Sequence, residues 1–341
     1  MLLRLPNELL QYIAEDLELA RHINAFARTN TYLYNLINPY LYRYDIQQLG
    51  SSALSWAAKH GQEATAQRSL DLGAHAQSLS KSNESPLLLA ARNGHEALVK
   101  LLLATEGTNP DSQDPNGRTP LSWAAEYGNE AVIRLLLGTE RVNPHSHDFN
   151  GRTPLSWAAM NGHEKVVKLL LTMEGMNPDS QDFGGQTPLL WAAMSGHNGV
   201  AKLLLSSNGV NPDSKNSNGE SSLSWAARNG DKAMVKLLLT TEGVNPNSQD
   251  SDGWTPLLYA AVGGHEAVVK LLLATEVVNP DLQAYNGRTP LSWAAEEGHE
   301  TVVKLLLATE NVNPNSQDSS GQTPLWWAAA FGHETIVKLL Q

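Results

Sequence analysis

Residues 153–171 read TPLSWAAMNGHEKVVKLLL, and this stretch decides the fold because close copies of it recur along the chain. Its tryptophan, Trp157, stands 34 positions after Trp123. The same step leads on to Trp191, Trp225, Tyr259, Trp293 and Trp327, and two weaker copies centred on Trp56 and Leu89 come before. A fixed period of this size predicts stacked helical units, each of which needs a neighbour to bury its apolar face.

Each copy carries the signals for two helices. Thr153 is suited to cap a helix, and Pro154 to occupy its first position, where a missing N–H costs nothing. We expect Gly162 to end this first helix. A second helix is predicted over residues 164–171, and Asn177-Pro178 is expected to end it and to open a polar loop. The predicted unit is therefore a helix, a turn, a second helix and a projecting loop.

The two faces of the first helix differ in character. At roughly 100° per residue, Leu155, Ala158 and Ala159 share a narrow face, which we predict to be core. Trp157 falls roughly 200° from Leu155 on the same wheel, so we expect it to line the opposite surface of the stack.

The pattern T-P-L-x-x-A-A-x-x-G-H-x-x-V-V-x-L-L-L resembles the ankyrin repeat over about residues 51–341. The resemblance implies an all-α solenoid of about nine helix-turn-helix repeats, with a degenerate first repeat at 51–84 and an incomplete last one. Ser156 stands where the family has the histidine of its TPLH motif, so the hydrogen bonds of that histidine are lost or replaced. Beyond Gln341, we expect either that the natural chain continues or that this end self-associates.

The first fifty residues differ from the repeats. Three short helical segments are expected here, the last of them at 32–42 and closed by Asn38-Pro39. The opening L-P-x-E-L-L-x-x-I resembles the F-box, a helical module that in its family binds the Skp-type adaptor of a cullin–RING ubiquitin ligase. The resemblance implies that the adaptor is contacted by Leu5, Pro6, Leu9, Leu10 and Ile13. The alternative is that residues 1–50 only cap the first face of the solenoid.

Composition argues against several classes of partner. The formal charge is −11 and the chain has no basic cluster, which argues against nucleic acid and anionic membrane surfaces. No apolar run is long enough for a membrane span or a signal peptide, so the expected location is cytoplasmic and/or nuclear. There are no cysteines, hence no thiolate metal sites and no disulfides.

Residues of catalytic type recur once per repeat rather than in clusters. His163 has its equivalent in most other copies, so these histidines cannot converge on one metal. Loop aspartates such as Asp182 are suited to capping turns, and no phosphate-binding glycine spacing is present. We therefore expect no enzyme, no metal and no cofactor, but a protein partner held in the concave groove.

The positions that vary between otherwise similar copies indicate the binding surface. They lie in the loop and at the end of the first helix, where ankyrin-repeat proteins contact partners. The candidate contacts are Arg118, Tyr127, Phe149, Arg152, Phe183, Trp254, Tyr285 and Arg288, with Trp157, Trp191 and Trp225 beneath them. The leading hypothesis is a substrate-recognition subunit of a cullin–RING ligase, and the alternative is an ankyrin scaffold with no ligase link.

One interior copy departs from the others. Residues 218–239 replace the helix-start proline with Ser222 and the usual His-Glu pair with Asp231-Lys232. Lys232 and Lys236 then stand as like charges one helical turn apart. We expect this repeat to open first among the interior repeats.

Overall fold

The computed structural model describes residues 31–341, which form an all-helical fold in two compact units that divide between Phe149 and Asn150. The helices of the first unit are α3 (Thr31–Gln48), α4 (Ser52–His60), α5 (Glu63–Asp71), α6 (Pro86–Arg92), α7 (Glu96–Ala104), α8 (Pro120–Glu126) and α9 (Glu130–Leu137). Those of the second unit are α10 (Pro154–Met160), α11 (Glu164–Leu171), α12 (Pro188–Ser195), α13 (Asn198–Leu205), α14 (Ser222–Arg228), α15 (Lys232–Leu239), α16 (Pro256–Val262), α17 (Glu266–Leu273), α18 (Pro290–Glu296), α19 (Glu300–Leu307), α20 (Pro324–Ala330) and α21 (Glu334–Leu340).

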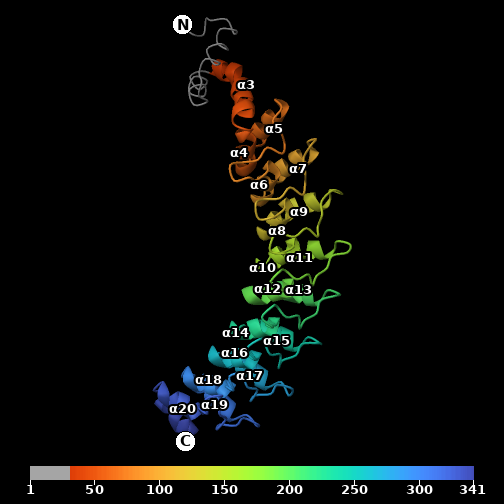
Figure 1. Cartoon of the computed structure of the whole chain (residues 1–341). Coiled ribbons are helices and arrows are strands. Elements are labelled where there is room, and N and C mark those ends of the chain that lie inside the picture. Colours follow the sequence, from red (N-terminus) through yellow and green to blue (C-terminus); the bar gives the residue numbers. More distant parts are fainter. Residues whose placement is uncertain (1–30) are drawn as a thin grey trace. The chain divides into compact units, whose positions relative to one another are not determined.

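Within each unit the helices form two layers. In the first unit α4, α6 and α8 stack on one another, and α5, α7 and α9 form the second layer (Figure 1). In the second unit the layers begin with α10 on α12 and with α11 on α13, and they continue in the same order to α20 and α21. Each first helix also packs on the second helix of its own repeat. The predicted all-α arrangement of stacked helix pairs is confirmed.

The first helix of each repeat begins where the sequence predicts. The Thr153 hydroxyl accepts a hydrogen bond from the Ser156 amide at 3.2 Å, and Pro154 occupies the first turn. The Ser156 hydroxyl lies 3.1 Å from that of Thr153 and accepts from its amide, which completes a capping box. Serine thus supplies capping hydrogen bonds at the position where the family has histidine.

The core follows the predicted narrow face. Leu155, Ala158 and Ala159 are fully buried in α10, and Val167 and Leu170 are fully buried in α11. The alanines allow close approach of neighbouring helices because they have no side chain beyond Cβ. Repeats are therefore joined mainly by apolar packing between successive first helices and successive second helices.

A histidine and a glycine of the preceding repeat form a second link between repeats. The Nε2–H of His299 donates to the carbonyl oxygen of Val262 at 2.8 Å. Its ring lies over Gly264, where a Cβ atom would stand 2.6 Å from the ring and where φ is +64°. Glycine fits both requirements. Within residues 31–341, the recurring histidines therefore have a structural role.

The structure confirms one predicted helix end and corrects another. Helix α11 covers Glu164–Leu171 as predicted, and it ends before Asn177-Pro178 is reached, so this dipeptide is not what stops the helix. Asn177 instead accepts from the Asp179 amide at 3.0 Å within the loop. Helix α3 continues through Pro39, which removes one backbone donor while the turns on either side persist.

Helix α3 is fixed to the first repeat at its C-terminal end. The buried Asp45 carboxylate accepts from the Ser52 hydroxyl and from the Ala53 amide at 2.9 Å.

None of the helices within residues 31–341 is long and apolar enough to cross a membrane.

Candidate protein-interaction surface

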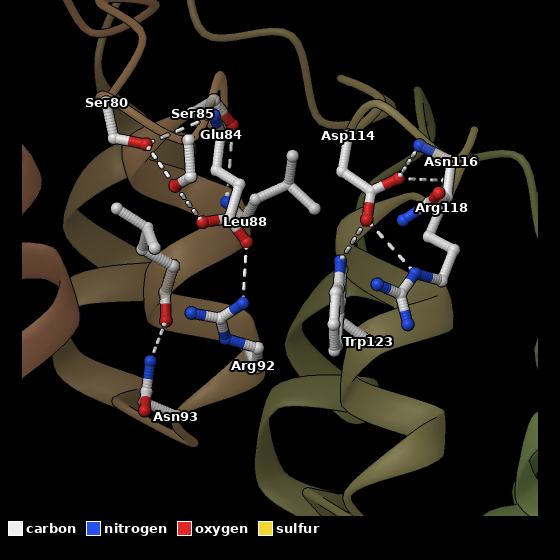
Figure 2. Close-up of polar contacts among 12 residues, drawn as sticks. Ser80, Glu84, Ser85, Leu88, Arg92, Asn93, Asp114, Asn116, Arg118 and Trp123 are labelled. Carbon is white, nitrogen blue, oxygen red and sulfur yellow. Dashed lines mark hydrogen bonds and ion pairs between the residues drawn. The ribbon is translucent and has the colours of Figure 1, made fainter.

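In most repeats the projecting loop is a hairpin organised by an aspartate. The Asp114 carboxylate accepts from the amides of Asn116 at 2.8 Å and Arg118 at 2.9 Å (Figure 2). Its other oxygen accepts from the indole Nε1–H of Trp123 at 3.2 Å. One aspartate therefore both closes the turn and ties the hairpin to the first helix.

The same bond recurs in the second unit with the same spacing of nine residues. Trp191 donates to Asp182 at 3.1 Å, and Trp327 donates to Asp318 at 2.9 Å. The Tyr259 hydroxyl donates to Asp250, and burial, followed by this hydrogen bond, raises the pKa of Tyr259. Tyrosine can replace tryptophan here because both present a donor at the far edge of a flat ring.

Two repeats of the second unit lack the aspartate. Asn216 and Ala284 occupy its position in the repeats of Trp225 and Trp293. The indole Nε1 atoms of these two tryptophans are buried, and neither has a hydrogen-bond partner among residues 31–341. A buried donor without a partner costs about 1–3 kcal/mol, so these are local weak points.

Arginine side chains stack on the aromatic rings. In the first unit, the Arg118 guanidinium lies 3.4 Å from the centroid of Trp123. In the second unit, three arginines each lie against the rings of two successive repeats at 3.5–5.2 Å: Arg152 against Trp157 and Trp191, Arg228 against Trp225 and Tyr259, and Arg288 against Trp293 and Trp327. Such contacts contribute ~0.5–2 kcal/mol each. We call these rings and arginines of the second unit the tryptophan row.

Ion pairs hold several of these arginines in place. Arg118 pairs with Glu126 at 3.0 Å, and Arg228 pairs with Glu220 at 2.9 Å. Burial raises the pKa of Glu126, while the charge of Arg118 opposes that rise. Arg288 pairs with Glu296, and its side chain is only 7% exposed. These guanidinium groups are engaged within the protein.

These contacts correct the partner-binding surface that the sequence predicts. Arg118 and Arg288 were predicted to contact a partner, but they lie largely buried between rings and carboxylates. Trp157 is 8% exposed, whereas the helical wheel placed it on the surface of the stack. The wheel gave its direction correctly, but the hairpin and the arginines cover that side. Trp191, Trp225 and Arg152 are half-buried in the same row.

Other predicted residues lie at the surface. Phe149, in the first unit, is 64% exposed, and Phe183 and Tyr285, in the second, are 75% and 72% exposed. Tyr127 is also exposed, and its ring stacks on Trp123 with centroids 5.9 Å apart. Trp254 is half-buried, with its centroid 5.0 Å from Tyr259 and 4.9 Å from Trp293.

The exposed rings are held on a fixed backbone. The Phe183 amide donates to the Asn150 carbonyl at 2.9 Å, and the Tyr285 amide donates to the Asp252 carbonyl at 3.0 Å. Each ring borders the turn glycine of the preceding hairpin: a Cβ atom on Gly151 or Gly253 would stand 2.8 Å from it. Phe183 and Tyr285 therefore combine large exposed area with an ordered position, and we call them the hairpin aromatics.

The structure does not describe the predicted adaptor contacts. Leu5, Pro6, Leu9, Leu10 and Ile13 fall outside the described residues. Within residues 31–341, no group of three histidine, aspartate or glutamate side chains is arranged to hold a metal ion.

Comparison with protein families identifies the repeat. The model of ankyrin repeats (3 copies) matches seven overlapping segments: residues 24–114, 54–143, 87–182, 139–216, 201–281, 223–318 and 276–341. The chain belongs to the ankyrin-repeat family. Members of this family are generally non-catalytic scaffolds for protein–protein interaction. A search of curated proteins found no match to this ankyrin-repeat chain.

The bond between the hairpin aspartate and the tryptophan was missed from the sequence. Its signal was present, because an aspartate stands nine residues before most aromatic residues of the row. Taken separately, the aspartate predicts a turn cap and the tryptophan predicts a surface ring, and neither pattern alone indicates the bond between them.

Proposed function

We propose that this ankyrin-repeat protein binds a protein partner through the hairpin aromatics of its second unit, Phe183 and Tyr285. The observation that carries the proposal is their exposure on a hydrogen-bonded backbone. Aromatic side chains contribute disproportionately to protein interfaces, and little conformational entropy is lost when they are already ordered. The tryptophan row beneath them supports the hairpins and is not the contact surface itself.

We further propose that residues 1–50 dock the Skp-type adaptor, which would make the chain a substrate-recognition subunit of a cullin–RING ubiquitin ligase in the cytoplasm and/or nucleus. The support is the opening L-P-x-E-L-L-x-x-I, which carries Leu5, Pro6, Leu9, Leu10 and Ile13. Co-precipitation of the full chain with the adaptor tests it, with Leu5→Ala/Pro6→Ala/Leu9→Ala as the variant. Unchanged adaptor binding, or none in either protein, would favour the ankyrin scaffold without a ligase link.

The partner surface is tested by proximity labelling with the full chain. The double variant Phe183→Ala/Tyr285→Ala should lose the principal labelled partner. Its matched control is Ser217→Ala/Ser251→Ala, at the same hairpin position of two neighbouring repeats, where the amides donate to Gly184 and Asn218 at 2.9 and 2.8 Å. The control should retain the partner. An identical set of partners for both variants, with the fold intact by circular dichroism, would exclude the hairpin aromatics.

A further inference from the structure

The second repeat lacks both members of the bond between aspartate and tryptophan. Ser80 and Leu89 stand where the next repeat has Asp114 and Trp123. The Ser80 hydroxyl still accepts from the Glu84 amide at 3.1 Å, as Asp114 does from Arg118, so the turn persists (Figure 2). Leucine, however, is much smaller than an indole ring. A cavity of about 870 Å³ opens beside Leu89.

Part of the wall of this cavity is apolar and exposed. Trp56 and Leu79 both line it, and each is 52% exposed. Trp56 is exposed because the degenerate first repeat has no aspartate hairpin to cover it. The Ser55 side chain is buried at the cavity wall, and its Oγ has no hydrogen-bond partner among the described residues. Because that Oγ is itself inaccessible, the surface offered to a ligand is the apolar one of Trp56, Leu79 and Leu89.

The rim of the cavity is positively charged although the chain as a whole carries −11. Lys59 and Lys81 line it, both are exposed, and neither forms an ion pair within residues 31–341. The one carboxylate of the lining, Glu84, already pairs with Arg92 at 2.6 Å and accepts from Ser82. The two lysines are therefore available to an anionic ligand.

We propose that this cavity docks a peptide segment of a partner protein in which a carboxylate flanks a leucine or an aromatic side chain. The apolar side chain would fill the space beside Leu89, against Trp56 and Leu79. The carboxylate would pair with Lys59 or Lys81. The inference rests on the proposed function only in taking the occupant to be a protein segment. Its site lies in the first unit, apart from Phe183 and Tyr285.

Selection from a displayed random-peptide library against the full chain tests the proposal. The retained peptides should carry aspartate or glutamate within two positions of leucine, phenylalanine or tryptophan. The sequence of residues 5–19 of this chain, which also has leucines beside carboxylates, is included as one member. Retention of basic peptides, or of none, would overturn the proposal. If only the 5–19 peptide is retained, the occupant of the cavity is a segment of this chain and not a partner protein, which would also overturn the proposal.

Two variants of the full chain then locate the binding. Leu89→Trp fills the cavity with the residue that most other repeats carry. Lys59→Glu/Lys81→Glu reverses the charge of the cavity rim. Each should weaken the selected peptide at least ~10-fold, while Lys100→Glu, an exposed charge reversal on α7, should not. Equal affinity in all three folded variants would overturn the site. Phe183→Ala/Tyr285→Ala should leave peptide affinity unchanged, which separates this test from that of the proposed function.

Discussion

At the scale of single residues, the hairpin aspartate is the acceptor that orders both the hairpin and the aromatic ring of its repeat. It satisfies two turn amides and one aromatic donor at once. Where alanine replaces it, at Ala284, Trp293 has no acceptor, and the Nε of Arg288 is also buried without a partner among the described residues. The repeat of Trp123 shows both groups bonded to one carboxylate, from Arg118 Nε at 3.0 Å and from the indole at 3.2 Å.

Ala284→Asp should therefore stabilise the protein. The new carboxylate would accept from Trp293 and Arg288, two buried donors, and we expect a gain of about 1–2 kcal/mol in the free energy of unfolding. Urea unfolding at pH 7 measures it. Ala284→Leu serves as the control, since it adds volume without an acceptor. Equal stability of the aspartate and leucine variants would contradict the role assigned to the hairpin aspartate.

A second group of aspartates links successive loops. Asp111 accepts from the Asn143 amide at 2.9 Å, and Asp179 accepts from the Ser214 hydroxyl at 3.0 Å. Asp213 and Asp281 occupy the same position in later repeats. Burial raises the pKa of all four above the ordinary value of 3.8, although hydrogen bonds from the next loop oppose the rise. Asn247 fills this position in another repeat and accepts from the Asn279 amide at 2.8 Å.

These four aspartates should make the protein less stable as pH rises. The folded chain holds their protons more tightly than the unfolded chain, so the free energy of unfolding falls as pH increases from about 3.8 through the raised pKa values. Replacing Asp111, Asp179, Asp213 and Asp281 together by Asn removes this contribution. The stability of the variant relative to the parent should increase from pH 3.5 to pH 7. Parallel pH profiles for the two proteins would refute this assignment.

At the scale of helices, the repeat at 218–239 illustrates compensation. The sequence predicts it to be weak because Lys232 and Lys236 repel each other and the first-turn proline is absent. In the structure, however, the Asp231 side chain accepts from the Ala233 and Met234 amides, both at 3.0 Å. No other second helix within the described residues has a side-chain cap of this kind.

Asp231→Ala should cost about 1 kcal/mol of stability, with the loss localised to α15. Hydrogen–deuterium exchange of the full chain can resolve this, since the α15 amides should exchange faster while those of α11 remain unchanged. Asp252→Ala, at an exposed hairpin position, is the control for the loss of one charge. If α15 exchanges at the same rate in both variants, the Asp231 cap is not what holds this repeat together.

The helix pairs were largely predictable because their signals are local. Thr153 and Pro154 fix the start of α10 by hydrogen bonding and geometry within one turn. The wrong helix end is at Pro39, where α3 continues, and Pro178 lies beyond the end of α11 without causing it. A proline predicts a boundary only where the flanking chain has no other stabilising contacts, and those contacts cannot be read from the local sequence.

At the scale of the whole molecule, the surface was predictable only in part. The stacked ankyrin repeats were predicted correctly because periodicity repeats the same evidence many times. The wheel gave a direction for each tryptophan, but not what lies on that side. The Asp182 hairpin and the Arg152 guanidinium reach Trp191 from outside its helix. The cavity beside Leu89 was likewise missed, although leucine at a tryptophan position was its signal.

We propose that stability and binding reside in different residues of the second unit. Phe183→Ala and Trp191→Phe in the full chain, compared by urea unfolding and by retention of the labelled partner, test it most directly. Phe183→Ala should change the free energy of unfolding by less than about 0.5 kcal/mol and lose the partner. Trp191→Phe removes the donor to Asp182 and should cost about 1–2 kcal/mol, while the folded protein retains the partner. Partner loss in Trp191→Phe with retention in Phe183→Ala would contradict the account.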